Sequence, residues 1–181
     1  PHPIQSRIPV INAAASEEGR AFAMRNADFL FTPVFDFDQA KATVDEISQK
    51  SASVGRDVNV LTFCTVVCRP TRQEAEDYLH WYANENADWD AVDNLMTLQG
   101  MHAQSFTKEA LSMFRDRFAA GHGGFPLVGT PDHIADQLER LSETGVAGTT
   151  LSFVDYAKEF PYFRQEVLPR LEAKGLRQTV S

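Results

Sequence analysis

The stretch Gly129-Thr-Pro-Asp-His-Ile-Ala-Asp-Gln-Leu-Glu-Arg-Leu-Ser-Glu-Thr-Gly-Val-Ala-Gly-Thr-Thr-Leu-Ser-Phe153 contains the signals of a capped helix, a glycine turn and a strand. Thr130 is placed to accept hydrogen bonds from the first N–H groups of a helix that begins at Pro131, where the missing N–H of proline costs nothing. Apolar residues at three- and four-residue spacing give this helix one buried side, and Gly145 ends it. The run 148–153 is short, apolar and rich in β-branched residues, so we expect a strand covered on both faces. The stretch predicts one unit of a parallel α/β sheet.

Length and composition limit what the chain can be. With 181 residues, of which 43% are hydrophobic, it can bury a sizeable core, and we expect one domain over residues 1–181. A net charge of -8, with no clustered basic face, argues against nucleic acid and anionic membrane as partners. No apolar run reaches membrane-spanning length and no signal segment is visible, which predicts a cytoplasmic enzyme or binding protein.

Two cysteines occur in one extended run. Cys64 and Cys68 are four residues apart, which places them on one face of a strand but roughly 13 Å apart, too far for a disulfide. We interpret them as small buried hydrophobic residues rather than a metal or redox pair. The histidines lack metal-ligand spacing, so we predict no metal site.

Alternating strands and helices fill the rest of the chain. The expected strands are 10–12, 27–31, 58–68 and 148–153, and the expected helices are 17–26, 39–53, 72–84, 88–101, 106–119, 131–144 and a broken helical segment from 154 onward. The short strand 10–12 is expected to be buried, and the buried side of the helix 39–53 is expected to include Ala42, Val44 or Ile47, and Val54. The longest strand, 58–68, is apolar on both sides, as a parallel barrel strand requires. Four strand–helix units indicate an α/β fold, either half of a (β/α)8 barrel or a small open sheet.

Three stretches resemble the bacterial luciferase-like flavin-dependent monooxygenases. They are Val10-Ile-Asn-Ala-Ala-Ala-Ser-Glu-Glu-Gly-Arg-Ala-Phe-Ala-Met-Arg-Asn-Ala-Asp28, Pro126-Leu-Val-Gly-Thr-Pro-Asp-His-Ile-Ala-Asp-Gln-Leu138, and Leu151-Ser-Phe-Val-Asp-Tyr156 with Val167-Leu-Pro-Arg-Leu171. Within the family they are most similar to the pyrimidine oxygenase and dimethylsulfone monooxygenase branch. The resemblance implies the C-terminal half of a TIM (β/α)8 barrel, strands five to eight, with extra helices between strands seven and eight.

The resemblance also implies an activity. Enzymes of this family take reduced FMN from a separate flavin reductase, form a flavin peroxide with O2 and oxygenate a small organic substrate. Two alternatives stay open: a deazaflavin-dependent oxidoreductase of the same superfamily, which the absorbance of the bound cofactor would reveal, and a non-catalytic flavin-binding half-barrel.

The loop after the first expected strand is the predicted cofactor site. Small residues opening a helix at the carboxyl end of a strand let backbone N–H groups approach a phosphate, and the helix dipole favours the anion. In the family a serine at the position of Ser16 binds the FMN phosphate, and Asn12, Ala14 and Ala15 belong to the same loop. The alternative is that Ser16 only caps its helix. The carboxylates at 17 and 18 would repel a phosphate unless they point outward.

The predicted substrate residues are Phe63, Thr65 and His122. In the alkanesulfonate branch an arginine and a histidine project inward where this chain has Phe63 and Thr65, so the cation that would hold a sulfonate is lost. This change predicts a neutral substrate, although Phe63 is equally explained as barrel filling. His122 is expected on a mobile gate in the glycine-rich loop, residues 121–126. The alternative is that His122 is an exposed histidine without a role in the reaction. Asp155 either faces the site or caps the next helix, and no catalytic residue is identified.

Four barrel strands leave two unpaired edges and an apolar inner face. We therefore expect this chain to associate with a missing N-terminal barrel half or with a copy of itself as a homo-oligomer.

Overall fold

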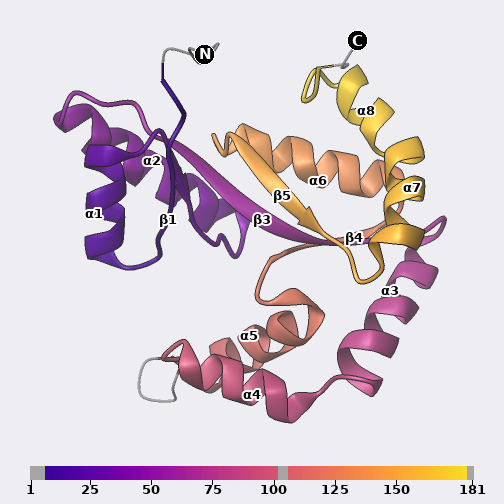
Figure 1. The fold of residues 1–181 in the computed structure, drawn as a ribbon. Helices are drawn as coiled ribbons and strands as arrows, with labels where there is room; N and C mark the ends of the chain where they lie inside the picture. The colour runs from indigo at the N-terminus through magenta and orange to yellow at the C-terminus, as the bar shows by residue number, and fades with distance from the viewer. Residues whose placement is uncertain (1–6, 102–105, 179–181) are drawn as a thin grey trace, which may run out of the picture. The chain divides into compact units, whose positions relative to one another are not determined.

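The computed structural model describes residues 7–101 and 106–178 (Figure 1). His102 and the start and end of the chain lie outside these ranges. The chain forms two compact units, which are described separately below. Unit 1 is Pro1–Phe63 with Arg140–Thr150, and unit 2 is Cys64–Glu139 with Leu151–Ser181. A single domain over 1–181 remains a prediction.

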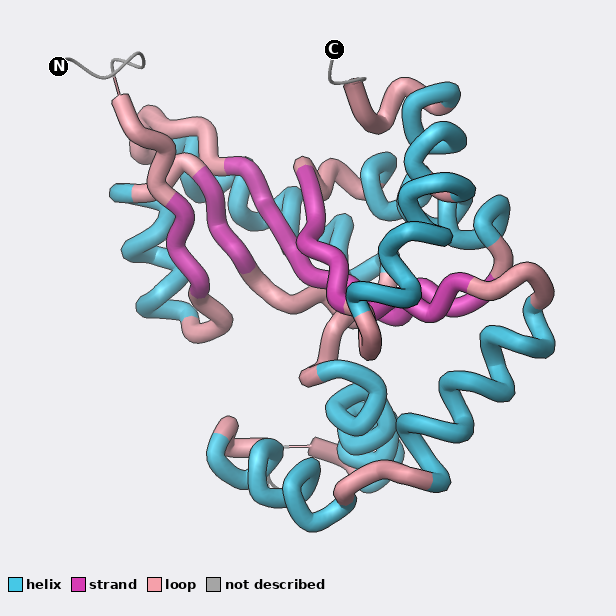
Figure 2. Tube along the Cα trace, turned by 45° about the vertical axis from the view of Figure 1, so that its right-hand side comes forward, coloured by secondary structure: helices cyan, strands magenta, loops and turns pink. Residues whose placement is uncertain are grey.

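Unit 1 begins with a parallel sheet and two capped helices. Its elements are β1 (Ile11–Ala13), α1 (Glu17–Asn26), β2 (Phe29–Phe31), α2 (Phe37–Ser53) and the first part of β3 (Asn59–Cys68). β2 pairs in parallel with both β1 and β3 (Figure 2). Asn12, Leu30 and Val60 lie in register across the three strands. Each helix starts where a side chain accepts a hydrogen bond from the first turn: Ser16 caps α1, and Asp36 caps α2.

One side of this sheet is packed and the other is partly open. Leu30 and Val60 belong to the core cluster, together with residues of α1 and α2. Residues on the opposite side include Ile11, which is 58% exposed, and the half-buried Phe31. The expectation that 10–12 is a buried strand is therefore wrong. An apolar sequence favours burial, but burial also needs a covering layer, and in the described part of the chain the helices of unit 1 cover the other side.

Two further burial expectations need correction. The strand β5 (Gly148–Ser152) forms as predicted and pairs with β3, but its residues are half-buried or exposed instead of covered on both faces. On α2 the buried side is Ala40, Thr43, Ile47 and Ser51, which confirms Ile47. Ala42 and Val54, expected on that side, are exposed, Val54 by 51%. Val54 follows the last helical residue, where the helical period no longer directs its side chain.

Unit 2 contains the second part of β3 and most of the helices. Its elements are α3 (Arg72–His80), the π-helix η1 (Trp81–Glu85), α4 (Trp89–Leu98), α5 (Lys108–Gly121), β4 (Phe125–Gly129), the larger part of α6 (Pro131–Glu143), α7 (Tyr156–Glu166) and α8 (Leu168–Ala173). α6 starts as expected, with His133 N–H donating to Thr130 Oγ1 at 3.3 Å. The extra helices that were expected between the strands 58–68 and 148–153 are present as α3, η1, α4 and α5.

The strand β4 was not predicted from the sequence. It pairs in parallel with β3, from Cys64 opposite Phe125 to Cys68 opposite Gly129. Pro126 lies inside it and glycines precede it, and both features argue against a strand when read locally. The described chain therefore has five strands, not four, because pairing with β3 overrides the local signals.

Candidate functional site

The loop after β1 carries Ser16 at the start of α1. Ser16 Oγ accepts a hydrogen bond from Gly19 N–H at 3.1 Å, so the serine does cap its helix. Because Oγ acts as the acceptor in this bond, the hydroxyl hydrogen remains available to a ligand. Ala15 and Ser16 are exposed. Capping and anion binding are therefore compatible at Ser16.

The backbone at Ala14 is already engaged. Ala14 N–H donates to Phe31 O at 3.1 Å, which extends the pairing of β1 with β2. This amide cannot also bind a phosphate without breaking that bond. The donors that remain include the Ser16 hydroxyl and the N–H groups of Glu17 and Glu18 in the first turn of α1, which have no acceptor within the helix.

Gly19 shapes the same loop and was not among the predicted residues. A Cβ atom at this position would come within 2.7 Å of Ala14 Cβ, so α1 lies against the loop at a distance that only glycine permits. A glycine inside an otherwise helical pattern is the signal that could have identified it.

Asn12 lies on the helix-covered side of the sheet. It is in register with Leu30, whose side chain belongs to the core with α1 and α2. Its Oδ1 atom is buried and has no hydrogen-bond partner. As placed, this acceptor faces away from the open side of the sheet, and a role for Asn12 in cofactor binding stays a prediction.

The charges beside the loop partly balance. Glu17 lines a groove between α1 and α2 with Arg20, Glu46 and Lys50. The pKa of Lys50 is raised above its usual value, mainly by its hydrogen bond to Glu46 and to a smaller extent by Glu17. Glu17 thus has a cation nearby, whereas the exposed Glu18 still opposes an anion. The Ser16 hydroxyl and the first turn of α1 fit a phosphate, with Glu18 as the unfavourable neighbour.

Unit 2 contains a cavity of about 280 Å³. Its lining comes from β3, η1, the end of α5 and the end of β5: Thr65, Val66, Tyr82, Ala119, Ala120, Gly121, Ser152, Phe153 and Val154. No Asp, Glu, Lys, Arg or His is among these residues. Burial, helped by Glu159, raises the pKa of Tyr82 to about 12, so the phenol stays neutral. The described residues that line the cavity offer hydroxyl groups and apolar surface but no charge.

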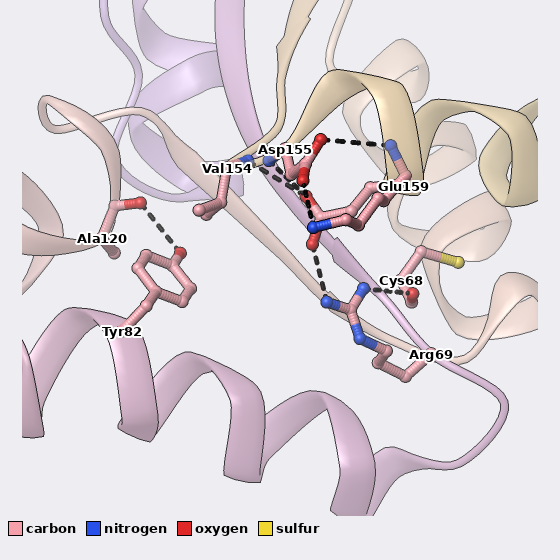
Figure 3. A network of polar contacts seen from close by, with 8 residues as sticks. Cys68, Arg69, Tyr82, Ala120, Val154, Asp155 and Glu159 are labelled. Carbon is pink, nitrogen blue, oxygen red and sulfur yellow. Dashed lines mark hydrogen bonds and ion pairs between the residues drawn. The ribbon is translucent and has the colours of Figure 1, made fainter.

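Glu159 of α7 is a buried carboxylate that accepts hydrogen bonds from Val154, which lines this cavity, and from two neighbouring residues (Figure 3). One of its oxygens accepts from Arg69 Nη2 at 2.6 Å, and the other accepts from the N–H groups of Val154 at 3.0 Å and Asp155 at 3.2 Å. The Arg69 guanidinium also lies 3.9 Å from the centre of the Tyr78 ring. No local pattern predicts this network, because Arg69 and Glu159 are 90 residues apart in the chain.

Comparison with known proteins assigns the chain. The model of the family described as luciferase-like monooxygenase matches residues 1–148. The chain belongs to the luciferase-like monooxygenase family. The branches suggested by the sequence stretches are represented among its relatives: the chain is 30% identical over 188 residues to an FMNH2-dependent dimethylsulfone monooxygenase of Pseudomonas fluorescens (strain Pf0-1), and 26% identical over 184 residues to a pyrimidine monooxygenase of Caulobacter vibrioides.

These luciferase-like relatives are about twice as long as the chain. The two alignments cover 97% and 96% of this chain but 50% of each relative. The crystal structure of DmoA from Hyphomicrobium sulfonivorans superposes with a TM-score of 0.78 at 22% identity, over 94% of this chain and 42% of that one. This likeness confirms the expected α/β fold, with the chain matching about half of a luciferase-like TIM barrel.

The predicted substrate residues of this luciferase-like chain lie in different surroundings. Phe63, in unit 1, stacks on Phe31 with ring centres 5.9 Å apart. Thr65, in unit 2, lines the cavity and is 7% exposed. His122 is exposed outside the cavity lining, with Nε2 3.2 Å from Gln99 Nε2. Asp155 accepts from Lys158 N–H at 3.2 Å, so it caps α7.

The remaining sequence expectations concern cysteines, metals and membranes. Cys64 and Cys68 are buried, as predicted, and burial raises the pKa of Cys68 to about 11. Within residues 7–101 and 106–178, no group of His, Cys, Asp and Glu side chains has the arrangement of a metal site. Over the same ranges, no helix combines the length and apolar character needed to cross a bilayer.

Proposed function

We propose that the full-length protein is a two-component monooxygenase that uses reduced FMN and O2 to oxygenate a small neutral organic molecule. Membership of the luciferase-like family carries this proposal. The relative from Pseudomonas fluorescens is named for its dependence on FMNH2. Reduced FMN, when bound, supplies the two electrons with which one oxygen atom of O2 enters the substrate while the other leaves as water. A separate flavin reductase would supply the reduced cofactor.

Ser16 is the residue that we assign to the cofactor phosphate. Its hydroxyl is exposed at the N-terminus of a ten-residue helix, and its hydrogen is not used by the capping bond. The first-turn N–H groups and the helix dipole favour an anion at the same place. A hydrogen bond from a neutral hydroxyl to a charged phosphate is among the stronger kinds in proteins.

The uncharged cavity supports a neutral substrate. A sulfonate or carboxylate would lose its hydration there without meeting a cation, which is costly. A volume of about 280 Å³ lies near the lower limit for small-molecule pockets, so the substrate is small. The hydroxyl of Thr65 offers one hydrogen-bonding group toward such a molecule. Sulfones, sulfides and pyrimidines satisfy these conditions, and relatives of this chain are named for each of them.

Coupled turnover tests the proposal. The full-length protein, FMN, NADH and a flavin reductase would be supplied with O2 and, in turn, with dimethyl sulfone, dimethyl sulfide, uracil and methanesulfonate. We expect an oxygenated product from at least one neutral compound and none from the sulfonate. Oxygenation of methanesulfonate alone would contradict the neutral cavity as the substrate site.

A deazaflavin-dependent oxidoreductase is the second candidate. Deazaflavin (F420)-dependent enzymes are among the proteins that share the fold, with TM-scores of 0.59 and 0.55 at 19% and 13% identity. This likeness concerns the fold alone and is weaker than that to DmoA. Absorbance of the cofactor that co-purifies with the full-length protein separates FMN from deazaflavin, and a deazaflavin spectrum would overturn the FMN assignment.

A further inference from the structure

Glu159 differs from the other acidic residues of the chain in its burial. Its side chain is buried, with 8% of the residue exposed, and no other Asp, Glu, Lys or Arg in the described parts of the chain is buried. Burying a carboxylate is unfavourable unless both of its oxygens are hydrogen-bonded and a cation balances its charge. Glu159 meets this condition with the Arg69 guanidinium and two backbone N–H groups, those of Val154 and Asp155.

The network reaches the cavity by two routes. The first is direct, because Val154 lines the cavity and its N–H is fixed by Glu159 (Figure 3). The second passes through Arg69, which is held by Glu159 and packs on Tyr78. The Tyr78 ring lies 5.3 Å from that of Tyr82, which also lines the cavity and donates from its hydroxyl to Ala120 O at 2.9 Å.

The same network connects the residues that follow β3 with those that follow β5. Arg69 follows β3 directly, and its N–H donates to Gly129 O at the end of β4. Its Nη1 donates to Cys68 O at 2.9 Å. Val154 and Asp155 follow the end of β5. The Glu159 carboxylate therefore ties the chain just after β5 to the chain just after β3, within unit 2.

We infer that Glu159 is a positioning residue for the substrate: through Val154 and Arg69 it fixes the part of the cavity wall formed by Tyr82, Ala120, Phe153 and Val154. The inference rests on the proposed function, because it assigns this cavity to a small neutral substrate. Glu159 itself does not line the cavity. Its effect on the reaction is therefore indirect, through the position of the groups that surround the substrate.

Glu159→Gln is the primary variant. Glutamine has the same shape, but its NH2 group must face either the guanidinium of Arg69 or the two backbone N–H groups, so donors oppose donors on one side. The matched control is Glu166→Gln. Glu166 is on the same helix and pairs with Arg170 at 3.3 Å, and neither of these residues lines the cavity.

Hydrogen exchange provides a readout that does not depend on activity. In the full-length protein, we expect Glu159→Gln to raise the exchange rates of the Val154 and Asp155 amides by about tenfold or more, while Glu166→Gln leaves them unchanged. Unchanged exchange at both amides in Glu159→Gln would overturn the inference, whatever the enzyme does.

Steady-state kinetics test the link to the substrate. With the neutral compound that gives the highest turnover as the probe, we expect Glu159→Gln to raise KM by roughly tenfold with a much smaller change in kcat, because the cavity wall is displaced and the cofactor loop is not. Glu166→Gln should retain both constants. Faster amide exchange with unaltered KM would overturn the positioning role and leave the proposed monooxygenase intact.

Two further results separate the remaining possibilities. Arg69→Lys is the variant to use if Glu159→Gln does not fold. It keeps the charge next to Glu159 but loses the planar guanidinium that also donates to Cys68 O, so we expect it to raise KM as well. An unchanged KM in Arg69→Lys would then contradict the inference. If the wild-type protein oxygenates none of the neutral compounds, the proposed function fails and the assignment of Glu159 to substrate positioning fails with it.

Discussion

Gly121 lies directly against Thr65. A Cβ atom at position 121 would come within 2.1 Å of Thr65 Cγ2, so only glycine lets the end of α5 approach β3 this closely. Both residues line the uncharged cavity of unit 2. The glycine-rich loop thus has a steric role beside the cavity, which the sequence alone did not indicate.

This contact predicts a compensating pair of substitutions. Gly121→Ala should destabilise the protein by about 1 to 3 kcal/mol through overpacking. Thr65→Ser removes Cγ2, so the double variant should recover part of that loss. Urea unfolding of the four proteins of this cycle measures the coupling. Gly175→Ala is the control. Gly175 also has a positive φ but no atom close to its would-be Cβ, so this substitution measures the loss of stability that comes from the backbone conformation without a steric clash. Additive losses at 121 and 65 would show that the two side chains do not meet.

Ser16 has a capping role and a proposed ligand role, which substitutions can separate. We expect Ser16→Ala to weaken FMN binding by about 1 to 2 kcal/mol, because it removes a hydrogen bond to a charged group. Ser16→Asp should keep the cap but weaken binding further, because its carboxylate repels phosphate. Asp36→Ala removes the equivalent cap of α2 and is the control for helix stability. An FMN titration in which Ser16→Asp matches the wild type would exclude phosphate contact at Ser16.

His122 has a left-handed backbone conformation, with φ of 56°. Glycine adopts this conformation at no steric cost, whereas alanine does not, so His122→Gly should be more stable than His122→Ala by roughly 0.5 to 1 kcal/mol. If the imidazole closes over bound flavin, both variants should lose turnover to a similar extent. Thermal unfolding and kcat/KM measure the two effects. Full turnover in His122→Gly would leave the ring without a role in the reaction.

Cys68 predicts a pH-dependent stability in the alkaline range. Burial raises the pKa of this thiol from 9.0 to about 11, so between these values the unfolded chain has lost the proton that the folded chain retains. Because the folded state binds more protons, the free energy of unfolding falls as pH rises through this window. Cys68→Ala removes this contribution and should have a flatter pH dependence between pH 9 and 11. Parallel curves for the two proteins would mean that the thiol titrates normally.

Short-range signals determined much of the fold from the sequence. Thr130, Pro131 and Gly145 predict α6 and the turn before β5, and the helix cap that was the alternative role for Ser16 is present. These features depend on hydrogen bonds and steric limits within a few residues, so they can be read locally. The stretches that resemble the family likewise predicted the matching half of a luciferase-like barrel.

Only the tertiary structure decided where distant residues meet. β4 contains Pro126 and forms because β3 pairs with it, and the exposure of Ile11 follows from the absence of a helix on its side of the sheet among the described residues. The cavity gathers residues from four separate elements. Arg69 and Glu159 meet across 90 positions, a contact with no periodicity or spacing to announce it. Such contacts depend on how strands and helices pack, so the residue that holds the end of β5 became visible only in the folded chain.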